Sequence, residues 1–372
     1  MRTRGCQTSK DQIVKPQNSY SFTIRYKWHG GPGGTEKLES NIKAVFSIAG
    51  NYLANQNPDV NTAVRLLEDV SKIEFILVSD LFLTNSARYA DILLPSASFF
   101  ERWNIGETWG SANYLLLSQK VVEPEFERRT DYDWIRDVAH KLGVEAQLSE
   151  GRTEKEWIRH CLDSARENDP DRDYPTWEEF EKTGVHYFKP ETVVAFQKQI
   201  EDFENNPFKT PSGKIELFSK ELYDMQHPEV AAIPKYIPSW EGPEDELTKE
   251  FPLQCIGFKG KNRANSGMLT SPRMKDVQTQ KLWINPIDAQ QRGIEQHQLV
   301  RIFNRRGTVM IPANITPRII PGVVALQTGA WVQFDENGVD RGGSLNVLNS
   351  TRHTPIAKGN AHHTMLVEVE KA

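Results

Sequence analysis

Cysteine is scarce in this chain: only three occur in 372 residues, Cys6, Cys161 and Cys255, and they are far apart. Their spacing forms no CxxC pair, and three thiols cannot supply the four-cysteine site that holds zinc or an iron–sulfur cluster. A disulfide framework is equally excluded. The sequence therefore predicts no metal site built from its own cysteines.

Three further absences narrow the possible functions. No apolar run reaches the roughly 20 residues that a membrane span requires, and the opening MRTRGCQTSK shows no apolar export signal. The formal net charge of −5 argues against a partner held through nucleic-acid phosphates. A phosphate-binding GxGxxG or P-loop motif is also missing. We therefore expect no nucleic-acid partner and no direct membrane span.

What is present is an ordinary globular composition, with 38% hydrophobic and 26% charged residues, enough to bury two or three cores. Residues 1–40 are rich in Gly, Lys, Ser and Thr and are expected to be irregular. Residues 41–245 are expected to form an α/β domain with a helical and charged insertion. Short strands with close turn signals predict a small closed β-barrel over 246–372.

The α/β prediction is centred on Ile73–Val78, a β-branched and aromatic run typical of a buried parallel strand. A strand at Val45–Ala49 and a helix from Asn61 precede it and complete a βαβ unit. The loops Asn51–Asn55 and Ser79–Thr84 then follow the two strands at the same sheet edge, where open α/β sheets bind ligands. The pattern therefore favours a binding crevice at that edge.

Asp80 lies directly after this central strand, where a carboxylate can accept hydrogen bonds from a base or a ribose. The structural alternative is that Asp80 only caps the following turn. A second buried strand is expected at Asp91–Leu94, closed by Pro95.

Other elements follow from periodicity and turn residues. Helices are expected at 131–142, with Trp134, Val138 and Leu142 on one side, and at 154–165; an extended loop is expected from Phe99 to Leu117. The remaining predictions are a strand at 215–218, a linker at 228–243, a hairpin turn at 304–307, and barrel strands at 253–258, 282–284, 299–303, 307–311 and 323–326.

Four separated motifs carry a family resemblance: SDLFLTNSARYADILLP, TPSGKIELFS, INPIDAQQRGI and GSLNVLNSTRHTPIAKGNAHHTMLVEVEK. In order and spacing, residues 40–372 resemble the C-terminal part of the catalytic subunit of the dimethyl sulfoxide reductase family, and look most like its anaerobic members. The resemblance implies a Rossmann-like parallel-sheet domain, then a double-psi β-barrel that binds molybdopterin dinucleotide. The implied cofactor is bis(molybdopterin guanine dinucleotide) with molybdenum, used to reduce S-oxides or N-oxides in anaerobic respiration.

The resemblance also assigns cofactor-binding residues. These are Asn55, Ser79, Asp80, Lys259, Asn265, Ser266, Gly267, Asn346, His362 and His363. A buried Asp80 carboxylate would accept from guanine in a bidentate, charge-assisted contact. Each of three residues has a purely structural alternative. Ser266 would be a turn residue, Asn346 a bulge residue, and His363 a barrel histidine whose hydrogen bonds are made within the protein.

The sequence departs from the family pattern in three respects. Lys259 and Asn265 stand where members often have histidine, and His297-Gln298 replaces a Gly-Asp turn. The amino-terminal half, with the four cysteines of a [4Fe-4S] cluster and the serine that ligates molybdenum, is absent. No catalytic residue is therefore assigned. The implied partners are that half, an iron–sulfur electron-transfer subunit and a membrane-anchor subunit, in an extracytoplasmic complex peripheral to the membrane.

Two alternatives remain open at this point. In the first, the chain is a non-catalytic remnant or interaction module. In the second, it is a relative of formate dehydrogenase or nitrate reductase. The long motif NSTRHTPIAKGNAHHT favours the dimethyl sulfoxide reductase side.

Overall fold

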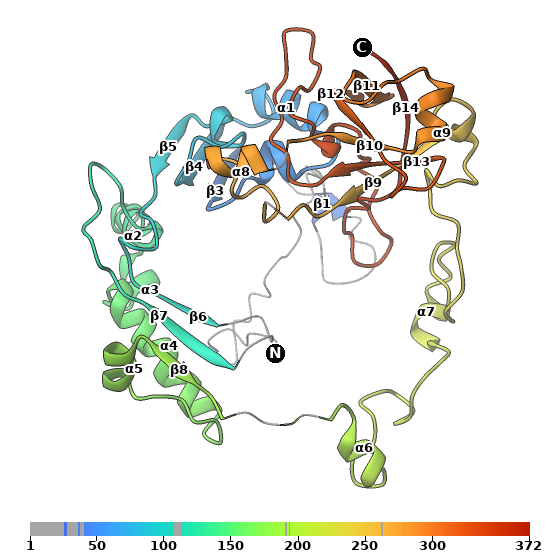
Figure 1. Cartoon of the computed structure of the whole chain (residues 1–372). Coiled ribbons are helices and arrows are strands. Elements are labelled where there is room, and N and C mark those ends of the chain that lie inside the picture. Colours follow the sequence, from blue (N-terminus) through green and yellow to red (C-terminus); the bar gives the residue numbers. More distant parts are fainter. Residues whose placement is uncertain are drawn as a thin grey trace. The chain divides into compact units, whose positions relative to one another are not determined.

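The computed structural model of the chain describes residues 26–27, 36–37, 41–107, 113–189, 192, 194–261, 263–277 and 279–372. Cys6 and most of the segment predicted as irregular, 1–40, lie outside these ranges; within it, β1 Tyr26–Lys27 pairs antiparallel with β2 Glu36–Lys37. The contacts group Leu94–Leu217 into one compact unit and Phe218–Ala372, with the described residues up to Leu93, into another (Figure 1).

The α/β part of the second unit is a three-stranded sheet with the order β3-β4-β5. Its strands are β3 Ala44–Ile48, β4 Phe75–Asp80 and β5 Ile92–Pro95. β3 and β4 are parallel, with Ile48 opposite Ser79, which confirms the predicted βαβ unit. The helical connection consists of η1 Tyr52–Gln56, a π-helical turn, and α1 Val60–Glu68, and η2 Ala87–Tyr89 follows β4.

Helix α1 begins one residue before the predicted Asn61, because Asp59 caps it and accepts a hydrogen bond from the Thr62 amide. The core beneath the sheet contains Leu53, Leu67 and Val78. The prediction that the strand after Asp91 is buried was wrong: Ile92 and Leu93 are 45% and 43% exposed. β5 is an edge strand of the described sheet and Pro95 is its last residue, so apolar composition alone did not indicate burial.

The second part of this unit is a closed six-stranded barrel with the order β10-β12-β11-β14-β9-β13. Its strands are β9 Leu253–Phe258, β10 Leu282–Ile284, β11 Leu299–Asn304, β12 Gly307–Ile315, β13 Val323–Gln327 and β14 Met365–Lys371. The β10–β12 and β9–β13 pairs are parallel and the other pairs are antiparallel. The predicted closed barrel is confirmed, although β14 was not anticipated as one of its strands.

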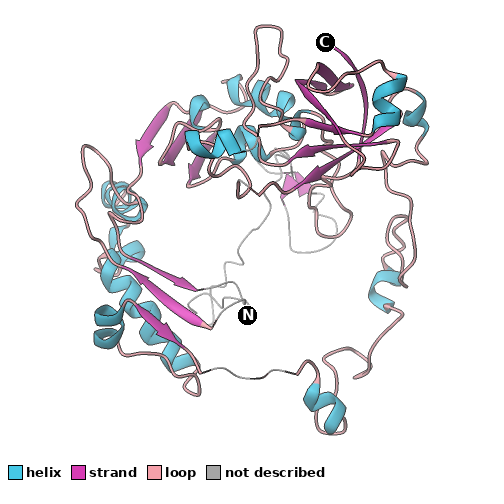
Figure 2. Cartoon of the chain, viewed as in Figure 1, coloured by secondary structure: helices cyan, strands magenta, loops and turns pink. Residues whose placement is uncertain are grey.

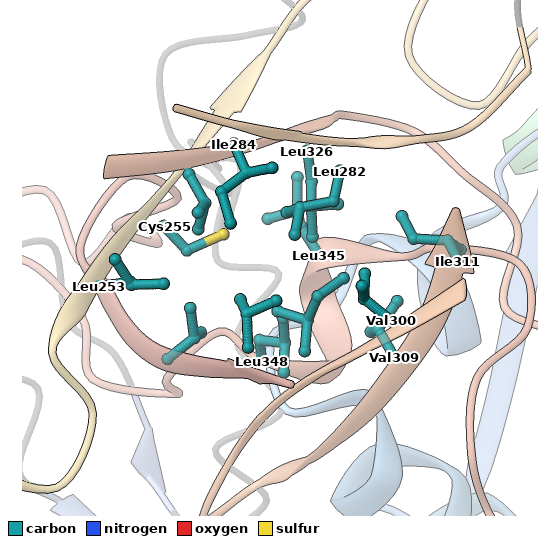
Figure 3. Close-up of a cluster of buried hydrophobic side chains, with 14 of the residues drawn as sticks. Leu253, Cys255, Leu282, Ile284, Val300, Val309, Ile311, Leu326, Leu345 and Leu348 are labelled. Carbon is teal, nitrogen blue, oxygen red and sulfur yellow. The ribbon is translucent and has the colours of Figure 1, made fainter. Parts of the chain in front are cut away.

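The barrel core follows from alternation along the strands. Val309, Ile311 and Ala313 of β12 point inward and are buried, whereas their sequence neighbours are partly exposed. Figure 3 shows side chains from several strands, including Leu253, Cys255 and Val300, together around Leu345 and Leu348. Helices α8 Pro272–Val277 and α9 Pro286–Gln291 and the short turns η3 Glu246–Lys249 and η4 Leu345–Val347 complete this part, and α7 Lys220–Asp224 precedes it.

The Leu94–Leu217 unit contains a small antiparallel sheet and several helices (Figure 2). Its elements are β6 Asn104–Glu107, β7 Tyr114–Ser118, β8 Val185–Tyr187, α2 Asp131–Lys141, α3 Glu145–Ser149, α4 Glu154–Asn168, α5 Trp177–Thr183 and α6 Gln197–Glu201. Capping boxes at Thr153 and Thr176 begin α4 and α5, and Leu162 and Phe180 are the most buried side chains of the core.

Two predictions for the middle of the chain were wrong. The expected loop from Phe99 to Leu117 contains a β6–β7 pair, and the expected strand at 215–218 is irregular. The helix predicted at 131–142 is confirmed as α2, in which Trp134 and Ala139 are buried while Val138 and Leu142 are exposed. No helix among the described residues is both long and apolar enough to cross a bilayer.

Candidate functional site

The predicted crevice edge of the sheet carries a buried polar network. Asn55, in η1, is 3% exposed, and its side-chain oxygen accepts a hydrogen bond of 3.3 Å from Asn85 Nδ2. Nearby, Asn51 Oδ1 accepts from both the amide and the hydroxyl of Ser86, at 3.1 and 3.0 Å. Ser79 at the end of β4 is fully buried. The two strand ends are therefore lined by side-chain amides and hydroxyls.

Asp80, the last residue of β4, caps the turn that follows it. Its Oδ1 accepts from the amides of Leu81 and Phe82, at 2.7 and 3.3 Å. Asp80 therefore makes the turn-capping contacts, and the guanine contact stays a prediction alongside them. A carboxylate fixed by its own turn is held in one orientation, which suits recognition of a planar base.

In the barrel, the predicted residues after β9 form a compact loop. The Lys259 ammonium contacts Asn265 Oδ1, and the Gly267 amide donates to the Ala264 carbonyl at 2.9 Å. Trp331 Nε1 donates to the carbonyl of Ser266 at 2.9 Å. This loop is pressed against Gly329, where a Cβ atom would lie 1.7 Å from the carbonyl oxygen of Asn265, so only glycine fits there.

The two predicted histidines precede β14 and differ in their contacts. His363 Nδ1 accepts from the Gly257 amide at 3.2 Å, which satisfies one ring nitrogen, although the residue itself is exposed. His362 Nδ1 lies 3.2 Å from Asn349 Nδ2, the side-chain amide nitrogen. Burial lowers the pKa of His362, with smaller contributions from His363 and Lys259. This shift favours the neutral form of His362, in which Nδ1 can accept from Asn349 Nδ2.

The barrel and the sheet edge meet through the segment after β13. Asn346 Nδ2 donates to the main-chain carbonyl of Asn55 at 2.7 Å, and Asn85 Nδ2 donates to the carbonyl of Val332 at 2.9 Å. Because Trp331 of the same segment also contacts Ser266, this segment connects Asn55, Ser266 and Asn346. The structure thus brings candidate residues from both parts of the unit to one region.

Several buried polar atoms of this region have no hydrogen-bond partner within the part of the chain that the structure describes. They are Asn51 Nδ2, Arg263 Nε and Nη1, Thr328 Oγ1, Asn346 Oδ1 and Thr364 Oγ1. Buried polar groups are normally satisfied, so this set indicates a polar ligand. Donors suit phosphate oxygens, and Asn346 Oδ1 suits a ring N–H. These atoms therefore fit a dinucleotide that carries a pterin.

Sequence reasoning missed Arg263 and Thr328. The sequence could have indicated Arg263 as a site residue. Basic residues occupy alternate positions directly after the predicted strand 253–258, namely Lys259, Lys261 and Arg263, and form a basic cluster at a strand end. No sequence pattern marked Thr328, because its position next to Gly257 depends on the β9–β13 pairing. Among the described residues, no group of three or more His, Cys, Asp or Glu is placed to hold a metal ion.

Two family models match this chain. Residues 25–141 match a molybdopterin oxidoreductase model, and residues 253–366 match a molydopterin dinucleotide binding domain. The first match includes Asn55, Ser79 and Asp80, and the second includes the barrel candidates through His363. The chain is therefore of the molybdopterin oxidoreductase class, and the two matches support a molybdopterin dinucleotide as its cofactor.

Curated relatives narrow the class. The chain is 43% identical to dimethyl sulfoxide reductase DmsA of Escherichia coli (strain K12), over 92% of this chain and 43% of the relative. It is 33% identical to a trimethylamine-N-oxide reductase of Haemophilus influenzae, over 91% of this chain and 42% of the relative. The chain belongs to the dimethyl sulfoxide reductase family. It spans less than half the length of these relatives.

A solved structure supports the fold independently. Acetylene hydratase from Pelobacter acetylenicus superposes with a TM-score of 0.69 at 20% identity, over 90% of this chain and 45% of that chain. At this identity the likeness shows a common fold only.

Proposed function

We propose that this chain is the C-terminal part of the catalytic subunit of a molybdenum oxidoreductase that reduces S-oxides or N-oxides. The relatives named for dimethyl sulfoxide and trimethylamine N-oxide reduction support this substrate class. The chain's own task in that enzyme is to hold bis(molybdopterin guanine dinucleotide).

One structural observation carries the proposal. The Asn346–Asn55 hydrogen bond joins the barrel to the sheet edge within a region that contains buried, unpartnered polar atoms. A ligand that reaches across both parts, as a long dinucleotide does, satisfies groups from each. Each polar group buried without a partner lowers stability by roughly 1–3 kcal/mol. A chain that binds no cofactor would therefore be less stable for having these groups and would gain nothing from them.

Roles within the site follow from the chemistry of each residue. Asp80 recognises guanine N–H groups, Ser79 and Asn55 line the same edge, and the Lys259 and Asn265–Gly267 loop faces the phosphates or the pterin. Asn346, His362 and His363 then contact the pterin from the barrel. When bound, the cofactor supplies the two-electron reduction that removes the oxygen atom from the substrate, while the protein binds and orients the cofactor.

The remaining features of the proposal extend the family resemblance. We propose that the domain boundaries lie at 41–245 and 246–372, and that the barrel is of the double-psi type, for which its mixture of parallel and antiparallel pairs is suitable. The molybdenum ligand and the [4Fe-4S] cluster would belong to an amino-terminal half. An iron–sulfur subunit and a membrane-anchor subunit are the proposed partners, in an extracytoplasmic complex.

The testing experiment is purification of the chain from its native host, with its molybdenum and guanine nucleotide measured and co-eluting polypeptides identified by mass. The expected result is two guanine nucleotides per molybdenum, together with a cysteine-rich polypeptide. Reduction of dimethyl sulfoxide and trimethylamine N-oxide by that assembly would then be assayed with a reduced dye. A folded, solitary chain with neither metal nor nucleotide would refute the proposal.

A further inference from the structure

Arg263 is an arginine buried without a counter-ion. Its side chain is 9% exposed, and its Nη2 donates a hydrogen bond of 2.9 Å to Gln280 Oε1. Its Nε and Nη1 atoms contact no acceptor, and it takes part in no ion pair, within the described part of the chain. Burial alone lowers the pKa of Arg263. Arginine nevertheless stays charged in proteins, so a positive charge is enclosed with only a neutral amide beside it.

The surrounding contacts hold this guanidinium in a fixed position. Gln280 Nε2 donates to the carbonyls of Gln327 and Gly343, at 2.9 and 2.8 Å, which orients Gln280 Oε1 toward Arg263. The amide side chain thus ties Arg263 to the end of β13 and to the segment before Asn346. Side chains held in this way lose little conformational entropy when they bind a ligand.

The position of Arg263 relates it to the candidate site. It begins the loop that contains Asn265 and Ser266, and that loop contacts Gly329 and Trp331. The Lys259 ammonium contacts Asn265 in the same loop. With Lys261 between them, three cationic residues therefore belong to one short loop that faces the end of β13, next to the unpartnered hydroxyl of Thr328.

We propose that Arg263 binds the diphosphate of the bound cofactor by donating from Nε or Nη1 to a phosphate oxygen. Nε and Nη1 lie on opposite sides of the planar guanidinium and Nη2 is taken by Gln280, so each free group donates singly, in a charge-assisted hydrogen bond, and the two do not form a fork. This assignment rests on the proposed function. The alternative is a structural arginine whose only task is its hydrogen bond to Gln280.

The two alternatives predict opposite effects on the ligand-free chain. A structural arginine stabilises the fold, so Arg263→Met would lower its melting temperature. An arginine kept for a ligand costs stability while it is unpaired, and a methionine of similar length removes that buried charge. We therefore expect the Tm of ligand-free Arg263→Met to be equal to or above that of the wild type.

The test is thermal unfolding of the ligand-free full chain with and without sodium pyrophosphate, at constant ionic strength. Wild type, Arg263→Met, Arg263→Lys and Arg318→Gln are compared; Arg318 is an exposed arginine of the same unit and controls for nonspecific charge effects. We expect pyrophosphate to raise the Tm of the wild type and Arg318→Gln by about 3 °C, Arg263→Lys less, and Arg263→Met not at all.

Three results would overturn the assignment: no shift in the wild type, an equal shift in Arg263→Met, or a Tm of ligand-free Arg263→Met below that of the ligand-free wild type. A second readout separates this inference from the proposed function. In chains purified from the host, guanine nucleotide content should fall severalfold in Arg263→Met and not in Arg318→Gln. If wild-type protein contains no guanine nucleotide, the proposed function fails; if it does and Arg263→Met retains as much, only Arg263 is wrongly assigned.

Discussion

The side-chain amide of Asn346 donates to the main-chain carbonyl of Asn55 over 2.7 Å, joining two residues 291 positions apart in the sequence. The same Asn346 presents a buried Oδ1 without a partner in the described structure. One nitrogen thus holds the barrel against the sheet edge, while the oxygen of the same group is available for a ligand. Asn346 therefore both joins the barrel to the sheet edge and presents an acceptor at the candidate binding site.

Replacing Asn346 by alanine should affect both properties. Loss of the hydrogen bond to Asn55 should lower the free energy of unfolding by about 1 kcal/mol, and nucleotide content should fall as the Oδ1 contact disappears. Denaturant unfolding and guanine nucleotide release measure the two effects. Asn337→Ala, in an exposed turn, is the matched control. Loss of stability with unchanged nucleotide content would mean that Asn346 is only a structural link.

Asp80 allows turn capping to be separated from guanine recognition. Asp80→Asn retains an oxygen that accepts from the Leu81 and Phe82 amides, but it replaces the second carboxylate oxygen by an NH2 group, which cannot accept from guanine N–H groups. We expect Asp80→Asn to unfold at nearly the wild-type temperature and to lose guanine nucleotide severalfold. Asp80→Ala should lose the nucleotide to the same extent but unfold at a lower temperature than Asp80→Asn, because it also loses both turn hydrogen bonds.

The measurement is guanine nucleotide released on denaturation, beside a melting curve for each variant. Full nucleotide retention by both Asp80 variants would leave turn capping as the only role of this carboxylate.

The elements predicted well from the sequence are those that local pattern determines. Val309 and Ile311 alternate inward along β12, within the strand predicted at 307–311. Failures occurred where tertiary position decides. Ile215 and Leu217 have a strand-like pattern but are exposed, and Ile92 is apolar at a sheet edge.

The candidate site shows the same division. Asp80 was predictable as a polar residue at a strand end, and the family motifs marked Asn346 and His363. The pairing of Asn346 with Asn55 was not predictable, because it depends on how the barrel packs against the sheet edge. The lack of a counter-ion next to Arg263 was also not predictable, since the sequence does not show which carboxylates lie near a buried cation.

His362 should make the stability of the fold sensitive to mild acid. Its pKa lies below the ordinary value of 6.5, chiefly because of burial, so between these two pKa values the unfolded chain binds more protons than the folded chain. The stabilisation from neutral His362 is present above pH 6.5 and is lost as the pH falls toward the folded-state pKa. Protonation would also remove the Nδ1 acceptor next to Asn349.

Unfolding free energies measured from pH 7.5 to 5 should therefore fall less steeply for His362→Asn than for the wild type. His297→Asn is the control, because His297 is exposed and its left-handed backbone, with φ of 66°, suits asparagine. Parallel pH profiles for the wild type and His362→Asn would show that His362 does not contribute to the acid sensitivity.

Adjacent arginines in the β11–β12 turn should differ strongly in their contribution to stability. Arg306 forms a bidentate ion pair with the buried Glu241, at 2.8 and 2.6 Å, whereas Arg305 pairs with the exposed Glu250. Breaking a buried pair leaves an uncompensated charge, while an exposed pair is screened by water. We expect Glu241→Gln to lower the free energy of unfolding by about 3 kcal/mol and Glu250→Gln by less than about 1 kcal/mol. Equal effects in denaturant titrations would mean that Glu241 is solvated and that the segment around it is not fixed to the barrel.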